Sequence, residues 1–149
     1  MLTPLKYVWA GPNTLLALFT AFALWLFSFL TRHPPRRVRF AVVEGVVEVS
    51  GGLVADVLGL MPTSGSLRQP GGAAALTLGH LVFALSPDDL DRTRLHESVH
   101  VRQYERWGPL FVPAYFAASF LAARRGQHAY LDNRFEREAY AVSDGQTPQ

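Results

Sequence analysis

The sequence predicts an α+β fold in which an N-terminal membrane helix precedes a small domain of a few β-strands, one long helix and further helices. Three observations support this prediction. An apolar run without charges lies near the N-terminus, valine-rich segments follow it, and the second half contains a segment with helix-start and helix-stop signals. At 149 residues, the chain is long enough for one compact domain.

The apolar run extends from Tyr7 to Leu30 and has no charge or helix breaker from Thr14 onwards. A helix of this length can cross a hydrocarbon core of about 30 Å at a rise of about 1.5 Å per residue. A cleaved signal peptide is disfavoured because the run ends without a small-x-small cleavage pattern, whereas a helix buried against the domain remains a rival. We therefore expect a transmembrane anchor over residues 1–33 and a domain over residues 34–149, joined by the stiff Pro34-Pro35 linker.

The charges on the two sides of the apolar run predict its orientation. Only Lys6 and the free amine precede the run, whereas four arginines follow it: Arg32, Arg36, Arg37 and Arg39. By the positive-inside rule, a single-pass protein with this pattern places its C-terminal domain in the cytoplasm.

Short strands are expected between the linker and the long helix. Val38 to Val49 is rich in valine and predicts one or two strands, with Gly45 at a turn or bulge. Leu53 to Leu60 fits either a short helix or a strand. Pro62 to Gly72 has the composition of a loop, and Ala73 to Leu85 is typical of a strand.

The boundaries of the long helix are the sharpest in the sequence. Ser86 is an N-cap residue followed by a proline, and Asp89 stands three residues after it, close to a capping box. Gly108 followed by a second proline predicts the C-terminal end, so the helix should extend from Pro87 to Trp107. Two further helices are expected over Val112–Ala123 and Asn133–Val142, joined by a connection at Gly126–Leu131.

The composition limits the ligands that a metal site can use and the partners that the chain can bind. The chain has no cysteine, which excludes disulfides and thiolate ligands, so any metal site must use histidine and carboxylate. The net charge is only +2 despite a calculated pI of 9.3, and no basic stripe with interleaved aromatic residues is visible. We therefore expect no nucleic-acid partner.

The long helix contains the stretch from His96 to His100, which has the pattern H-E-x-x-H. Residues four apart lie on one face of a helix, one turn apart, so both imidazoles can reach one zinc ion at about 2.0–2.1 Å. Glu97 stands beside the first histidine, where its carboxylate can reach a zinc-activated water as general base. This pattern predicts a Zn²⁺ site with hydrolytic chemistry.

A catalytic zinc needs a third protein ligand and an open position for water. Spacing alone does not choose among the candidates downstream. Glu136 has a competing explanation because Asn133 and Glu136 have the spacing of a capping box. Glu138 shares a helical face with apolar residues and is expected to point towards the core, which makes it a rival ligand. The candidates are His128, Asp132, Glu136 and Glu138.

The H-E-x-x-H stretch followed by Glu136-Arg137-Glu138-Ala139 resembles gluzincin metallopeptidases of the CAAX prenyl protease and membrane heat-shock protease type. It is also similar to small bacterial HExxHxxQ domains, with a match at Gln103. The resemblance covers roughly His96 to Tyr140 and implies a zincin-like domain with His96, His100 and Glu136 as zinc ligands and Glu97 as base. The chain has Tyr140 where the family has an aspartate that supports the ligand shell.

These features together predict a membrane-anchored zinc metallopeptidase acting on peptides or proteins near the bilayer, in a bacterial inner membrane. The alternative is a non-catalytic, zinc-stabilised domain that binds a membrane partner. The segment Thr77–His80 is a candidate edge for pairing with an extended substrate. Donors available to a developing oxyanion are Tyr104, His128, Tyr130 and Tyr140.

Overall fold

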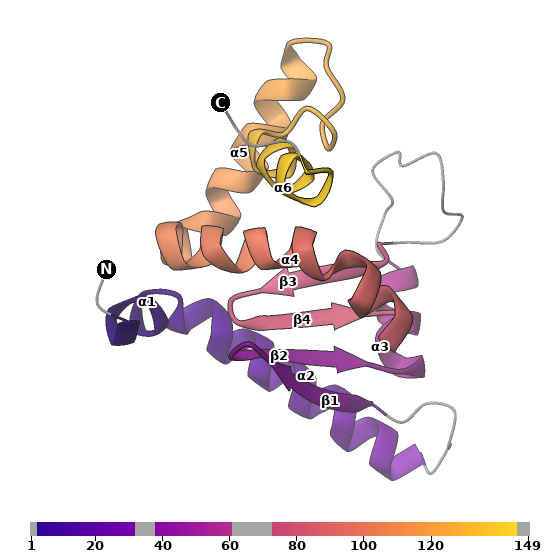
Figure 1. The fold of residues 1–149 in the computed structure, drawn as a ribbon. Helices are drawn as coiled ribbons and strands as arrows, with labels where there is room; N and C mark the ends of the chain where they lie inside the picture. Colours follow the sequence, from indigo (N-terminus) through magenta and orange to yellow (C-terminus); the bar gives the residue numbers. More distant parts are fainter. Residues whose placement is uncertain (1–2, 32–37, 61–72, 146–149) are drawn as a thin grey trace.

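The computed structural model describes residues 3–31, 38–60 and 73–145, and its architecture is mixed α+β (Figure 1). One four-stranded sheet has the order β1-β2-β4-β3. Its strands are β1 (Arg39–Val43), β2 (Val46–Ser50), β3 (Ala75–Leu78) and β4 (Leu81–Ala84). The helical elements are α1 (Thr3–Trp9), α2 (Gly11–Thr31), α3 (Gly52–Gly59), α4 (Pro87–Trp107), the 3₁₀ turn η2 (Gly108–Leu110), α5 (Phe111–Arg124) and α6 (Arg134–Ser143). The expected α+β class with an N-terminal apolar helix is confirmed.

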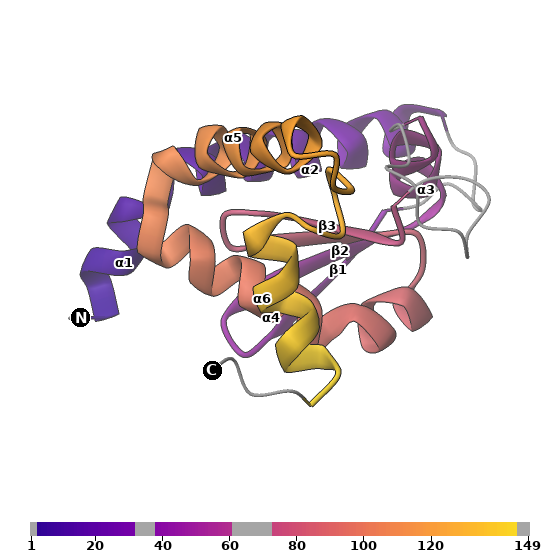
Figure 2. The same cartoon turned by 90° about the horizontal axis from the view of Figure 1, so that it is seen from above.

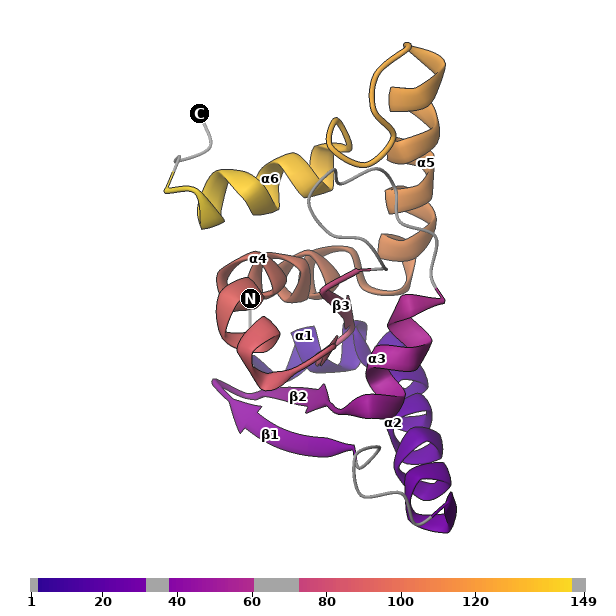
Figure 3. The same ribbon diagram turned by 90° about the vertical axis from the view of Figure 1, so that its right-hand side faces the viewer.

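Successive side chains of a strand point to opposite faces of a sheet, and helices cover both faces of this one. Val49 of β2 pairs in register with Phe83 of β4, and both pack against α2 and α3. Val82 points the other way and joins Leu90 and Val101 of α4. Figure 3 shows these layers from the side, with α4 on one side of the sheet and α2 and α3 on the other. The long helix is therefore held on a rigid platform.

The first hairpin confirms two strands within Val38–Val49. β1 and β2 pair antiparallel around Glu44 and Gly45, whose φ angles are 51° and 81°. Positive φ at both central residues is the requirement of a type I′ turn, which matches the twist of the flanking strands.

A single strand over Ala73–Leu85 is wrong: the segment is a second hairpin, β3 and β4, turning at Gly79 and His80. Gly79 has a φ of 62°, and glycine at the first central position is typical of a type II′ turn. The signal was present in the sequence, because this glycine stands between two short apolar runs.

The undecided segment Leu53–Leu60 is mostly helical, as α3, and buries Leu53, Val54 and Leu58 in the core. β2 and β4 are parallel neighbours, so the chain must leave the sheet and return between them, and α3 lies in that crossover. The predicted loop at Pro62–Gly72 falls within residues 61–72, which lie outside the described residues. The Pro34-Pro35 linker also lies outside them.

The prediction of a helix over Pro87–Trp107 is confirmed at both ends by α4. The Asp89 amide donates to Ser86 Oγ at 3.2 Å, and Gly108 takes a positive φ of 55° after the last turn. α5 and α6 begin and end within one residue of the helices expected from the sequence.

The N-terminal segment packs on the rest of the molecule. Lys6 pairs with Glu105 of α4 at 2.7 Å, and Asn13 Nδ2 donates to the Gly108 carbonyl at 3.0 Å. Thr14 Oγ1 accepts from the His80 amide, so the start of α2 is fixed to the second hairpin. α2 is long and apolar enough to cross a membrane by length and composition. The expected boundary at residue 33 lies outside the described residues.

Replacing Gly79 with alanine tests the contact between α2 and the hairpin. A Cβ there would lie 2.6 Å from Thr14 N and 2.7 Å from Thr14 Cα, in addition to the cost of a positive φ. We expect Gly79→Ala to lower the free energy of unfolding by about 2–4 kcal/mol in chemical denaturation in mild detergent.

Gly126→Ala is the matched control. Gly126 has a φ of 73° but nothing within 4 Å of its added Cβ, so only the backbone cost of about 1 kcal/mol should appear. Equal losses in the two variants would contradict the docking of α2 on the hairpin.

Candidate metal centre

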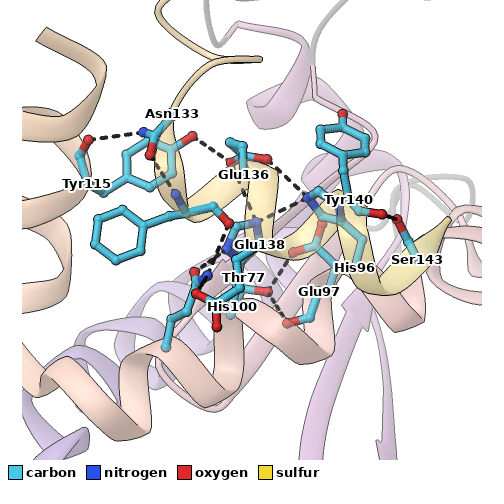
Figure 4. A network of polar contacts seen from close by, with 12 residues as sticks. Thr77, His96, Glu97, His100, Tyr115, Asn133, Glu136, Glu138, Tyr140 and Ser143 are labelled. Carbon is cyan, nitrogen blue, oxygen red and sulfur yellow. Dashed lines mark hydrogen bonds and ion pairs between the residues drawn. The ribbon is translucent and has the colours of Figure 1, made fainter. Parts of the chain in front are cut away.

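Two helices bring together the three residues that the sequence and the resemblance single out as metal ligands. His96 and His100 project from one face of α4, and Glu136 reaches them from the first turn of α6 (Figure 4). The two Nε2 atoms are 3.1 Å apart. Glu136 Oε2 lies 3.2 Å from His96 Nε2, and Oε1 lies 3.5 Å from His100 Nε2. His128 and Asp132, the other candidates, do not join this group.

The donor set fits a zinc ion. Ligands at about 2.0–2.1 Å in tetrahedral geometry stand about 3.3 Å from one another, close to the three separations in this group. Glu136 Oε2 is buried and makes no hydrogen bond within the described residues, although an imidazole nitrogen faces it. Donor atoms directed at one common point are what a cation requires. Nitrogen and carboxylate oxygen are also donors that zinc accepts.

The metal-free site is electrostatically coupled. Burial alone would raise the pKa of Glu136, but the two neighbouring imidazoles and the Tyr115 hydroxyl outweigh it and hold that pKa far below its usual range. Burial alone would lower the pKa of His100, but Glu136 outweighs it and raises that pKa above 6.5. At pH values below this raised pKa, a proton on His100 competes with a metal ion for the imidazole.

Gln103 fixes the orientation of His100. Its Nε2 donates to the Phe135 carbonyl and to Glu138 Oε2, both at 3.0 Å, so its Oε1 must face His100 Nδ1, 2.9 Å away. Nδ1 then carries the hydrogen, and Nε2 keeps its lone pair for a metal. Gln103 is completely buried, which makes this arrangement rigid.

Glu138 is therefore part of the support of the site and lies outside the ligand group. Its side chain is 31% exposed, accepts from Gln103 and pairs with Arg106 at 3.2 Å. The expectation that it points into the core is wrong, because a buried amide and an exposed guanidinium together place it at the edge of the α4–α6 contact.

Tyr115 of α5 supplies a contact that the sequence did not reveal. Its hydroxyl donates to Glu136 Oε1 at 2.6 Å, a short bond to a charged acceptor. Burial raises the pKa of Tyr115, which keeps the hydroxyl protonated as a donor. Tyr140, which stands where the gluzincins that the sequence resembles have an aspartate, places its ring edge-on to His96 with centroids 4.7 Å apart. The packing of α5 against α6 brings Tyr115 to Glu136, and no sequence pattern marks Tyr115 as its partner.

Asn133 links α5 to α6. Its Oδ1 accepts from the Phe135 amide and caps α6, while its Nδ2 donates to the Tyr115 carbonyl and to Ser119 Oγ. The capping box proposed for Glu136 is not formed, because that carboxylate is turned to the histidines and to Tyr115. One buried amide thus sets the position of the helix that carries Glu136.

Glu97 lies on the neighbouring face of α4, towards the sheet. Its side chain is buried, and Thr77 Oγ1 of β3 donates to its Oε2 at 2.6 Å. The hydroxyl holds one carboxylate oxygen and leaves the other without a hydrogen-bond donor among the described contacts. Its negative charge also contributes to the raised pKa of His100, so the two groups lie within electrostatic reach.

The candidate oxyanion donors separate into two groups. Tyr104 is buried against Phe111 in the core, and His128 Nδ1 accepts backbone amides of its own loop. Tyr130 and Tyr140 lie near each other, with ring centroids 6.4 Å apart, and burial together with the charge of Glu136 raises the pKa of Tyr130. These two tyrosines are the donors nearest to the centre.

No protein-family model, no curated protein and no solved structure matches this chain. The chemistry that the site can support therefore rests on its donors, their burial and their hydrogen bonds.

Gln103→Leu tests the support of His100. Loss of the acceptor frees the imidazole to rotate and to take the other tautomer, so zinc affinity should fall about 10- to 100-fold. A competition titration with a chromophoric chelator measures this affinity. Gln127→Leu makes the same change on the exposed connection before α6 and should leave the affinity unchanged. Similar affinities for the two variants would exclude the orienting role of Gln103.

The coupling between Glu136 and His100 predicts a pH dependence of metal binding. Because the pKa of His100 is raised, its imidazole holds a proton at pH 6.5 that zinc must displace. The affinity for zinc should therefore rise with pH through this range, and calorimetry at pH 6.5 in buffers of different ionisation enthalpy should show proton release. Binding without proton release at that pH would contradict the coupling.

Proposed function

We propose that this protein is a membrane-attached zinc metallopeptidase of the gluzincin type. The observation that carries the proposal is the convergence of two imidazoles and one buried carboxylate, with Glu97 beside them on the same helix. A purely structural zinc site has no use for that glutamate, and it is normally closed by a fourth protein ligand. Only three ligand residues meet here among the described residues.

The roles of the side chains follow from their positions. His96, His100 and Glu136 would hold the metal, which supplies a Lewis acid and lowers the pKa of a bound water towards neutrality. Glu97 would take a proton from the attacking water on its carboxylate and return it to the leaving amine. The Thr77 hydroxyl holds that carboxylate in place between the two steps.

A zincin-like arrangement is supported by the position of β3. This strand lies at the edge of the sheet and contacts α4 through Thr77 and Glu97. No strand of the described residues pairs with its outer edge, which leaves backbone groups for an extended peptide. We therefore propose peptides or proteins as substrates.

Attachment to a bacterial inner membrane completes the proposal. α2 is apolar enough for a membrane, and the arginines that follow it suit the anionic cytoplasmic leaflet, which favours a domain on the cytoplasmic side. Substrates would then be peptide segments close to the inner leaflet.

The decisive variant is Glu97→Gln. It keeps the side-chain shape but removes the base, so zinc content should remain stoichiometric while cleavage of a peptide library falls at least about 100-fold. Zinc content by atomic spectroscopy and cleavage by mass spectrometry measure the two effects.

Glu44→Gln, in the exposed turn between β1 and β2, is the matched control and should keep full activity. If the wild-type, zinc-loaded protein cleaves nothing in a broad library, the peptidase proposal fails and the alternative, a non-catalytic zinc-stabilised binding domain at the membrane, replaces it. If His100→Ala still holds stoichiometric zinc, the ligand assignment itself is wrong.

A further inference from the structure

Helix α2 is attached along its length to the same domain. At its start, Asn13 donates to the Gly108 carbonyl and Thr14 contacts His80. Further along, Ala17 and Ala21 are buried in the core beside the sheet, and Ser28 is buried near the other end. These positions follow the spacing of three to four residues that places side chains on one face of a helix. They form one stripe along α2. α2 therefore lies along the domain and does not project from it (Figure 1).

The rest of the surface of α2 is apolar and exposed. At 100° per residue, its exposed large side chains cover more than half of the helix circumference, and no charge interrupts them from Gly11 to Thr31. A protein partner seated on one side would leave part of this arc in water. Its exposed large apolar residues are Leu15, Leu16, Leu18, Phe19, Phe22, Trp25, Leu26, Phe27, Phe29 and Leu30.

α5 presents a second apolar surface on the same side of the molecule. Phe111, Tyr115 and Ala122 face inward, whereas Phe116 and Phe120 are exposed on the opposite side of the helix. The helix carries no charge before Arg124 at its end. Both helices run along one side in two perpendicular views (Figures 2 and 3).

We propose that α2 and α5 together form one bilayer-facing surface, with α2 lying in the plane of one leaflet instead of crossing the membrane. A crossing α2 would carry the sheet packed on it into the hydrocarbon core. That would place the outer edge of β1, with which no described strand pairs, and the Glu48–Arg94 ion pair at membrane depth, where exposed backbone and charge are costly. An in-plane helix buries its apolar arc about 5–10 Å deep and leaves the domain in water.

The occupant of this surface is a lipid bilayer. Exposed large apolar side chains gathered on two helices mark an interaction surface, and the arginines at the end of α5, Arg124 and Arg125, suit anionic headgroups. The inference deepens the membrane attachment of the proposed function. It does not depend on zinc binding or on cleavage, so it stands if the protein binds no zinc or cleaves no peptide. In the same way, a crossing α2 would leave the proposals of zinc binding and cleavage unchanged.

The chain has no cysteine, so single-cysteine variants report on topology without background. Val8→Cys lies before α2, Thr31→Cys at its end, and Arg102→Cys on the exposed side of α4. Each variant is reconstituted in vesicles of phosphatidylcholine and phosphatidylglycerol. Labelling by a membrane-impermeant maleimide is then measured with and without detergent.

Reconstitution gives both orientations, so labels are also counted per molecule by mass spectrometry in the combined variant Val8→Cys/Thr31→Cys. An in-plane α2 gives molecules with two labels or none, and Arg102→Cys is accessible to the same fraction as the two-label molecules. A crossing α2 gives one label on every molecule, and this result would overturn the proposal.

The role of α5 is tested by fluorophores attached at Phe116→Cys and, as control, at Arg106→Cys on α4. Quenching by nitroxide-labelled lipids should be strong at position 116 and absent at position 106. Absence of quenching at 116 would remove α5 from the membrane surface. Recovery of the wild-type protein as a soluble oligomer that does not float with vesicles would show that the surface binds other copies of the chain, and would also overturn the proposal.

Discussion

Burying two carboxylates beside one helix is the constraint on which the rest of this structure depends. A carboxylate removed from water is costly unless donors or cations surround it. Glu97 is satisfied by Thr77 of β3, and Glu136 by Tyr115 of α5 and the two histidines of α4. The edge strand, α5 and α6 are thus each tied to α4 by a polar contact, in addition to the apolar packing around it. The contacts that satisfy the two carboxylates therefore also fix the positions of these elements relative to α4.

Local signals in the sequence predicted what local interactions decide. The ends of α4 follow from Ser86 and Gly108, whose caps depend only on neighbouring residues. The pairing of His96 with His100 follows from helical periodicity alone. The turn at Gly79 was missed because an unbroken apolar run hides a two-residue turn, although the glycine marks it.

Tertiary contacts decided what the sequence left open. Glu136 and Glu138 are two residues apart on one helix, and only the packing of α6 on α4 turns the first to the histidines and the second to Gln103. No periodicity predicts that a tyrosine of α5 supports Glu136. Hydropathy predicted a helix apolar enough to cross a membrane, but it carries no information about the stripe of small residues by which α2 packs on the domain.

Helix α6 provides the third donor of the candidate centre, and this has a consequence for the order of events during synthesis. α2 leaves the ribosome before the sheet and α4 have been made. His96 and His100 follow about two thirds of the way along the sequence, but the carboxylate arrives only with α6. The three donors therefore cannot meet until α6 has been translated, long after the apolar surface of α2 has emerged.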